Sequence, residues 1–154
     1  MPHKYRVDFI YFLFIKMRQC LLYIALSFCV LSSAQAVEVI MNAIDTKELA
    51  LGNIDLRSIF SMRTRYWANG EKIRVFVLPD NNVLHKAFVK QKLHMFPHQL
   101  RRTWNRMTYT GTGQPPITVD SVSEMLEKIK HTKYSIGYID GRVEDETIHF
   151  FDTQ

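Results

Sequence analysis

The chain has 154 residues, a formal net charge of +5 and 47% hydrophobic residues, and the 118 residues after position 36 are enough for one domain with its own core rather than two. Its first 36 residues carry four Lys or Arg and one Asp, so the 118 residues that follow have a net charge of only +2, which argues against a dedicated nucleic-acid-binding protein. Both cysteines, Cys20 and Cys29, also lie in this first part, so the remainder has no disulfide and no thiol chemistry.

The amino-terminal segment has the three parts of a secretory signal peptide. Lys16 and Arg18 precede a nearly unbroken apolar run at 20–32, and Ala34-Gln35-Ala36 supplies small residues at the two positions that a signal peptidase reads. We therefore expect cleavage after Ala36 and a periplasmic location for the mature domain, residues 37–154.

An uncleaved membrane anchor is the alternative interpretation of this segment. The polar residues 16–19 divide its apolar sequence into two pieces, and each piece is too short to cross a bilayer core of about 30 Å. Translation can begin at Met1 or at Met17, and the second start would give a compact Met-Arg-Gln sequence before the apolar run.

The first half of the mature domain predicts two strands and a short helix. Val37–Ala43 is typical of a buried strand, and Ile54–Met62 places its apolar residues near one helical face, with Asn53 as the N-cap. Lys72–Leu78 alternates as a strand does, since Ile73, Val75 and Val77 face one way and Arg74 and Phe76 the other.

The second half predicts three helices and two strands. One helix follows Asp80-Asn81-Asn82, a second begins at Pro97, and a third begins at Ser121, which with Glu124 forms a capping box. The apolar positions of these helices are Leu84, Phe88 and Leu93, then Leu100, Trp104 and Met107, then Val122, Met125, Leu126 and Ile129. Tyr109–Pro116 is expected to be a loop, and Tyr134–Ile139 and Thr147–Phe151 to be strands around an acidic turn.

Strands that alternate with helices predict an α/β fold. We expect a single small domain with a mixed, mostly parallel sheet flanked by helices. The aromatic residues Trp67, Trp104, Phe60 and Phe88 are interpreted as anchors of its core.

Several sequence elements occur together in a familiar order. They are Ile59-Phe60, Trp67 with Asn69-Gly70, Phe88 after Asp80-Asn81-Asn82, Trp104, Thr110-Gly111-Thr112-Gly113 with Pro115-Pro116, and Ile136-Gly137-Tyr138. Between about Val39 and Asp140 the chain resembles the small secreted proteins related to the phosphate-binding components of ABC transporters, in the type 2 periplasmic binding protein superfamily. The resemblance implies a periplasmic-binding-protein-like domain and an oxyanion such as phosphate as its ligand.

Two segments are candidates for holding this anion. Backbone N–H groups at helix N-termini and in glycine-rich loops bind oxyanions without a dedicated cation. The candidate ligand-binding residues are therefore Asp80, Asn81 and Asn82 at a helix start, and Thr110, Gly111, Thr112 and Gly113 in a loop. We expect the ligand between the two segments, where Asp80 can accept a hydrogen bond from a protonated phosphate oxygen.

The helix-start segment departs from the pattern of phosphate-binding relatives, Arg-x-Asp-Gly-Ser-Gly-Thr. Matched to residues 78–84, only Asp80 is kept, and the Arg is replaced by Leu78, which removes the strongest bidentate oxyanion contact. The departure supports a second hypothesis, in which the domain is a non-catalytic periplasmic interaction module without ligand.

Other constellations are interpreted as structural. His94 and His98 have the spacing of helical metal ligands, but Pro97 lies between them, so no metal site is expected. Arg101, Arg102 and Arg106 are read as a solvated face, with an anion or partner contact, helped by Arg63 and Arg65, as the alternative.

No arrangement of residues suggests nucleophilic or acid–base catalysis, so we expect a protein that is not an enzyme and has no cofactor. The expected partners are a small oxyanion and an envelope or transporter protein. No nucleic acid is expected, and membrane contact is expected only through the amino-terminal segment.

Overall fold

The computed structural model describes residues 16–19, 36–42, 55–141, 143 and 145–151. The chain divides into two compact units, residues 1–34 and 35–154, and all the strands and the whole described core lie in the second. Most of the predicted signal peptide lies outside the described residues, as do the predicted N-cap Asn53 and the end of the first strand at Ala43. Within the described ranges, no helix has the length and apolar character needed to cross a membrane.

The sheet of the second unit has five strands in the order β3-β2-β4-β1-β5. Their bounds are Val37–Asn42 for β1, Arg74–Val77 for β2, Ile117–Thr118 for β3, Ser135–Asp140 for β4 and His149–Phe150 for β5. Strand β2 pairs in parallel with β3 and β4, whereas β1 pairs antiparallel with β4 and β5. The α/β fold with a mixed sheet is confirmed, but the longest pairing, between β1 and β4, is antiparallel.

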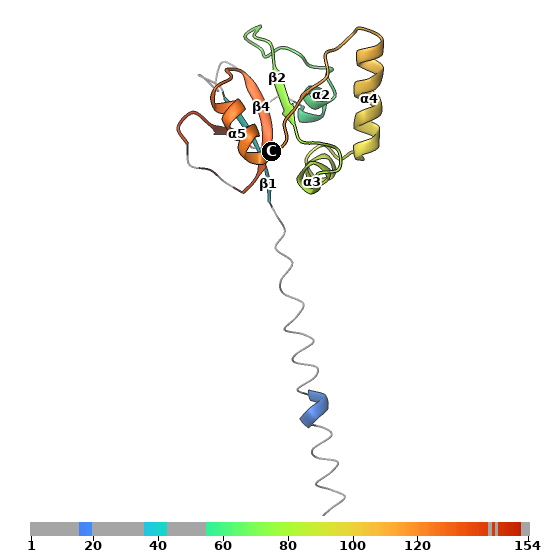
Figure 1. Cartoon of the computed structure of the whole chain (residues 1–154), viewed down its shortest axis with the longest axis vertical. Helices are drawn as coiled ribbons and strands as arrows, with labels where there is room; N and C mark the ends of the chain where they lie inside the picture. The colour runs from blue at the N-terminus through green and yellow to red at the C-terminus, as the bar shows by residue number, and fades with distance from the viewer. Residues whose placement is uncertain (1–15, 20–35, 43–54, 142, 144, 152–154) are drawn as a thin grey trace, which may run out of the picture. The chain divides into compact units, whose positions relative to one another are not determined.

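Helices lie on both sides of this sheet (Figure 1): α5 on one side, and α2, α3 and α4 on the other. Their bounds are Leu56–Phe60 for α2, Val83–Gln91 for α3, Pro97–Tyr109 for α4 and Val122–Lys130 for α5.

Neighbouring residues of β4 show how the two faces are filled. A Cβ atom at Gly137 would lie 2.7 Å from Ile129 Cδ1 and 2.8 Å from Met125 Sδ, so α5 packs directly on this glycine. The next residue, Tyr138, points to the opposite face, where its ring stacks on Phe88 of α3 with centroids 4.0 Å apart. The central strand is thus buried on both faces.

The helices begin where polar side chains can satisfy their first N–H groups. The carboxylate of Asp55, rather than Asn53, caps α2 by accepting from Arg57 N–H. The predicted Pro97 start and Ser121 cap are confirmed. The Glu124 carboxylate accepts from Asp120 N–H rather than from the backbone of Ser121, so the predicted capping box is only half formed.

The aromatic anchors predicted from the sequence are confirmed. Phe60, Phe88, Trp67 and Trp104 are all buried. The indole N–H of Trp67 donates to Tyr134 O at 3.0 Å, and that of Trp104 donates to Phe60 O at 2.6 Å. Each tryptophan ring therefore fills the core without leaving its N–H group unpaired.

Two predicted elements are shorter or shallower than expected. On α5, Met125 and Ile129 are buried, but Val122 and Leu126 lie at the edge of the core and are only partly covered. The predicted strand 147–151 pairs only at His149 and Phe150.

Candidate functional site

The structure does not bring the two predicted ligand-binding segments together. Asp80, Asn81 and Asn82 follow the carboxyl end of β2, whereas Thr110 to Gly113 precede the amino end of β3. Because β2 and β3 are parallel, these segments belong to opposite ends of the sheet. The 13 residues of α4, roughly 20 Å long at about 1.5 Å per residue, span the distance between them.

Asp80 is already engaged by a cation. The guanidinium of Arg101 donates to both carboxylate oxygens, from Nε to Oδ2 at 2.7 Å and from Nη2 to Oδ1 at 2.6 Å. This bidentate contact lowers the pKa of Asp80 below its usual 3.8. Arg101 also lies over the ring of Trp104, 4.8 Å from its centroid. Arg101 was expected on a solvated face, and its side chain is 40% exposed, but its guanidinium also holds Asp80.

Asn82 serves as the cap of α3. Its side-chain oxygen accepts from Leu84 N–H at 2.8 Å and from His85 N–H at 3.4 Å. The donors that the sequence analysis offered to an oxyanion are thus satisfied within the protein. Asn81 is exposed.

The Thr110–Gly113 loop closes the carboxyl end of α4. All four of its backbone N–H groups donate to carbonyls of residues 106–108, the last turn of the helix. Gly111 has φ +66°, the left-handed conformation with which helices commonly end. The predicted free donors of this loop are therefore occupied, and they lie at the negative end of a helix dipole.

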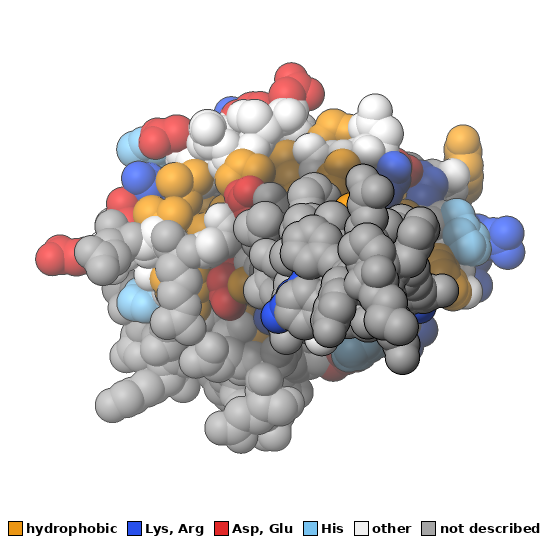
Figure 2. All heavy atoms as spheres, turned by 90° about the horizontal axis from the view of Figure 1, so that it is seen from below, with side chains coloured by type: hydrophobic (Ala, Val, Ile, Leu, Met, Phe, Trp, Pro, Cys, Tyr) orange, Lys and Arg blue, Asp and Glu red, His pale blue; other side chains and the backbone are white. Residues whose placement is uncertain are grey.

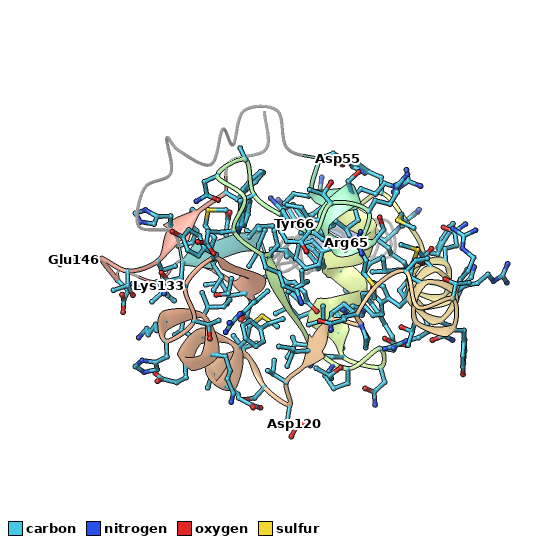
Figure 3. All side chains as sticks on the ribbon, turned by 90° about the horizontal axis from the view of Figure 1, so that it is seen from above. Asp55, Arg65, Tyr66, Asp120, Lys133 and Glu146 are labelled. Carbon is cyan, nitrogen blue, oxygen red and sulfur yellow. The ribbon has the colours of Figure 1, made fainter. Side chains whose placement is uncertain are left out.

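A cleft of about 540 Å³ lies elsewhere, at the amino end of β2. One side is formed by residues 64–66 and 72–75, and the other by Gly111 and residues 113–117. Figure 3 shows two of its residues, Arg65 and Tyr66, next to each other on the segment between α2 and β2. Gly111 and Gly113 are the predicted site residues that line this cleft, and none of residues 80–82 does so.

Three cations line the cleft. Arg65 Nη1 donates to Thr112 O at 2.8 Å, and Lys72 Nζ donates to Gln114 Oε1 at 2.7 Å, so both tie the loop to the opposite wall. Arg74 is exposed, and its guanidinium contacts no hydrogen-bonding or charged group among the described residues. Of the described residues that line the cleft, none is Asp, Glu, His or Cys. The cleft therefore carries positive charge without a matching carboxylate.

Apolar side chains form the rest of the cleft. Ile73 and Val75 of the β2 region, Pro115 and Pro116 of the loop, and Ile117 of β3 are among its lining residues. Of the three cations of the cleft, only Arg65 was given a functional role from the sequence, as a helper of an anion contact. The cations were scattered over ten residues without a motif, and only the pairing of β2 with β3 brings residues 113–117 against them.

Apart from the cleft, one buried polar side chain stands out. His85 lies on the side of α3 that faces the core. Its Nδ1 lies 2.6 Å from the hydroxyl of Tyr138, whose oxygen accepts from Leu78 N–H at 2.8 Å. Its Nε2 has no hydrogen-bond partner and lies 3.8 Å from Asp80 Oδ1. Burial lowers the pKa of His85 and raises that of Tyr138.

The sequence analysis missed this buried network. The available signal was helical spacing: His85 shares the apolar face of α3 with Leu84, Phe88 and Val89.

Metal binding has no support in the described ranges, because no group of three or more His, Cys, Asp or Glu there is arranged to hold an ion.

Comparison with models of protein families, with curated proteins and with solved structures finds no match to this chain.

Proposed function

We propose that residues 37–154 form a binding domain for a small organic anion, which occupies the cleft at the amino end of β2. The observation that supports this proposal is the charge of the cleft: Arg65, Lys72 and Arg74 line it, and no carboxylate of the described residues does. Guanidinium and ammonium groups bind carboxylates and phosphates through charge-assisted hydrogen bonds. Arg74, which has no competing partner among the described residues, is the first contact of the ligand.

The size and the walls of the cleft favour an anion with an apolar part. A volume of about 540 Å³ falls in the usual range of small-molecule sites, about 300–1,000 Å³. Ile73, Pro115 and Ile117 offer apolar surface that a bare inorganic ion would not use. A carboxylate or phosphate monoester with an aliphatic or aromatic body matches both the charge and the walls.

Binding without catalysis is part of the proposal, because the described residues of the cleft include no thiol, imidazole or carboxylate. The finer form of the hypothesis, an exported domain that delivers phosphate or a related oxyanion to an ABC transporter, rests on the sequence resemblance alone.

Calorimetry on the domain tests the proposal. We would titrate it with phosphate, sulfate, alkyl and aryl carboxylates, and phosphate monoesters. We expect the apolar monoanions and monoesters to bind more tightly than inorganic phosphate. Arg74→Gln and Arg65→Gln should each weaken binding at least about tenfold, since a charge-assisted hydrogen bond contributes about 1.5–3 kcal/mol.

Two further variants locate the site. Lys128→Gln removes an exposed cation of α5 and should leave the affinity unchanged. Asp80→Asn should do the same if the ligand lies in the cleft, whereas loss of binding in this variant alone would place the anion at the start of α3, as the sequence suggested. Valine at Gly111 or Gly113 is a poor test, because Gly111 has a positive φ and a Cβ at Gly113 would lie 3.1 Å from Met62 Sδ.

The alternative, an interaction module, is favoured by one observation beside the cleft. Strand β3 is at the edge of the sheet, and both of its residues, Ile117 and Thr118, are exposed. An extended acidic peptide could pair with this edge and place carboxylates near Arg74. Binding of no small anion, together with a β3 variant Thr118→Pro that prevents capture of an acidic peptide, would support this function instead.

A further inference from the structure

Charge is distributed unevenly along the chain. Between Asp80 and Asp120 the sequence has six Lys or Arg and no Asp or Glu, although the mature domain as a whole is close to neutral. This interval contains α3, α4 and the loop that follows them. The helical pair α3–α4 is therefore a strongly cationic part of a nearly neutral domain.

Four of the six cations are exposed and have no partner in the part of the chain that the structure describes. Lys86 and Lys90 are one turn apart on α3, and Arg102 and Arg106 are one turn apart on α4. Their side chains form no ion pair or hydrogen bond with any described residue, in contrast to Arg101, which is held by Asp80. Figure 2 shows Lys, Arg and His side chains gathered at the edge of the molecule where α4 lies.

Large apolar side chains accompany these cations. Phe96, immediately before α4, is 56% exposed, and Tyr109, at its end, is 88% exposed. Tyr109 lies three residues after Arg106 and seven after Arg102, so all three share one outer stripe of the helix. We call Lys86, Lys90, Phe96, Arg102, Arg106 and Tyr109 the basic surface.

We infer that the basic surface docks on a membrane that contains anionic phospholipid. Lys and Arg near a bilayer are attracted by anionic headgroups, and aromatic side chains such as Phe96 and Tyr109 are favoured at the interfacial depth. The apolar run at residues 20–32 also suits translocation across a membrane or anchoring in one, which would bring the domain close to a bilayer. The surface is separate from the cleft, none of whose lining residues belongs to it.

A nucleic acid is the competing polyanion, and the exposed aromatic side chains of the basic surface favour the membrane. A nucleic-acid duplex offers phosphates and base edges to cationic and polar side chains, whereas here large exposed apolar side chains stand at the start and the end of α4. The low net charge of the mature domain, +2, also differs from that of a nucleic-acid-binding domain.

The inference can be tested by vesicle binding of the fragment Gln35–Gln154. This fragment is the compact unit that contains the described core. We expect this domain to sediment with vesicles of phosphatidylcholine mixed with phosphatidylglycerol and not with pure phosphatidylcholine. Binding should weaken as salt is raised. Lys86→Gln/Lys90→Gln and Arg102→Gln/Arg106→Gln should each reduce the partition constant about tenfold or more.

The matched control is Lys128→Gln/Lys133→Gln, which removes the same charge from exposed positions on and after α5 and should change the partition constant less than about twofold. Phe96→Ser/Tyr109→Ser keeps every charge and should still lower the binding that persists at high salt. Circular dichroism and the melting temperature of each variant show whether it is folded. Equal binding to both kinds of vesicle, equal effects of the control and test pairs, or tighter binding to a DNA or RNA duplex than to anionic vesicles would overturn the inference.

Discussion

Single residues near the start of α3 couple stability to pH. The imidazole of His85 is fully buried, and its unpaired Nε2 faces the carboxylate of Asp80, which Arg101 already holds. Desolvation is the largest cause of its lowered pKa, and Arg101 lowers it further, while Asp80 opposes both. Neutral His85 is therefore the form that the folded state accommodates.

We expect the free energy of unfolding to fall as the pH is lowered through the ordinary histidine pKa of 6.5. Below that pH the unfolded chain binds a proton that folded His85 does not, so stability falls steadily until the pH reaches the lowered folded pKa, and the loss is constant below it. Urea denaturation between about pH 7.5 and 5 measures this slope. His85→Gln should flatten it, and His94→Asn, a change at an exposed histidine with positive φ, should preserve it. An unchanged slope in His85→Gln would show that another group is responsible.

Asp80 acts in a separate pH range. Because its folded pKa is lowered by Arg101, its contribution to stability is present above the unfolded value of 3.8 and is lost only as the pH falls further. The two residues can thus be distinguished by pH alone.

Trp104 is the residue whose truncation should cost the most. Its ring is buried between α2, α3 and the rest of the core, and its N–H donates to Phe60 O. We expect Trp104→Ala to lower the free energy of unfolding by about 3–5 kcal/mol. Trp104→Phe, which keeps a ring but leaves the Phe60 carbonyl without this donor, should cost about 1–3 kcal/mol. A cost of less than about 1 kcal/mol for the alanine variant would contradict the burial of the ring.

At the scale of elements, the cap of α3 is the segment whose role differs most from its prediction. Asn82 satisfies the first N–H groups of the helix, so its substitution tests structure, not ligand binding. Asn82→Ala should cost about 0.5–2 kcal/mol of stability. Its exposed neighbour provides the matched control, since Asn81→Ala should change stability by less than about 0.5 kcal/mol. Thermal unfolding of both variants measures these changes in stability. Equal changes in the two variants would show that the Asn82 cap contributes nothing.

Helix α4 has two roles that its sequence alone does not separate. Its inner face places Leu100 and Trp104 in the core, and Arg101 beside them reaches the carboxyl end of β2. The helix also extends from one end of the sheet to the other. The turn at Gly111 that follows the helix therefore lines the cleft and does not lie beside Asp80.

For the whole molecule, the predicted cleavage between Ala36 and Val37 can be tested. Strand β1 begins at Val37, directly after the predicted cleavage position, and Ala36 O accepts from Gly141 N–H. Val37 is buried in the sheet, so the predicted cleavage requires a peptidase to act before β1 pairs with β4. We expect mass spectrometry of the exported protein to find Val37 as its first residue. A full-length, membrane-retained species would instead support the uncleaved anchor.

The sequence by itself determined the local features of this protein. Pro97 and Ser121 start helices because their conformational preferences and hydrogen bonds act within a few residues. The burial of Phe60, Phe88 and Trp104 also followed from apolar spacing, because a helix of this composition must cover one face.

Only the tertiary structure decided which distant residues meet. A strand sequence does not encode its partner, so the antiparallel position of β1 beside β4 and the separation of Asp80 from Gly113 follow from the strand order alone. The pairing of Asp80 with Arg101, 21 residues away, and the cations of the cleft arise in the same way. Such contacts depend on long-range packing, in which many weak preferences are satisfied together, and no short motif records the result.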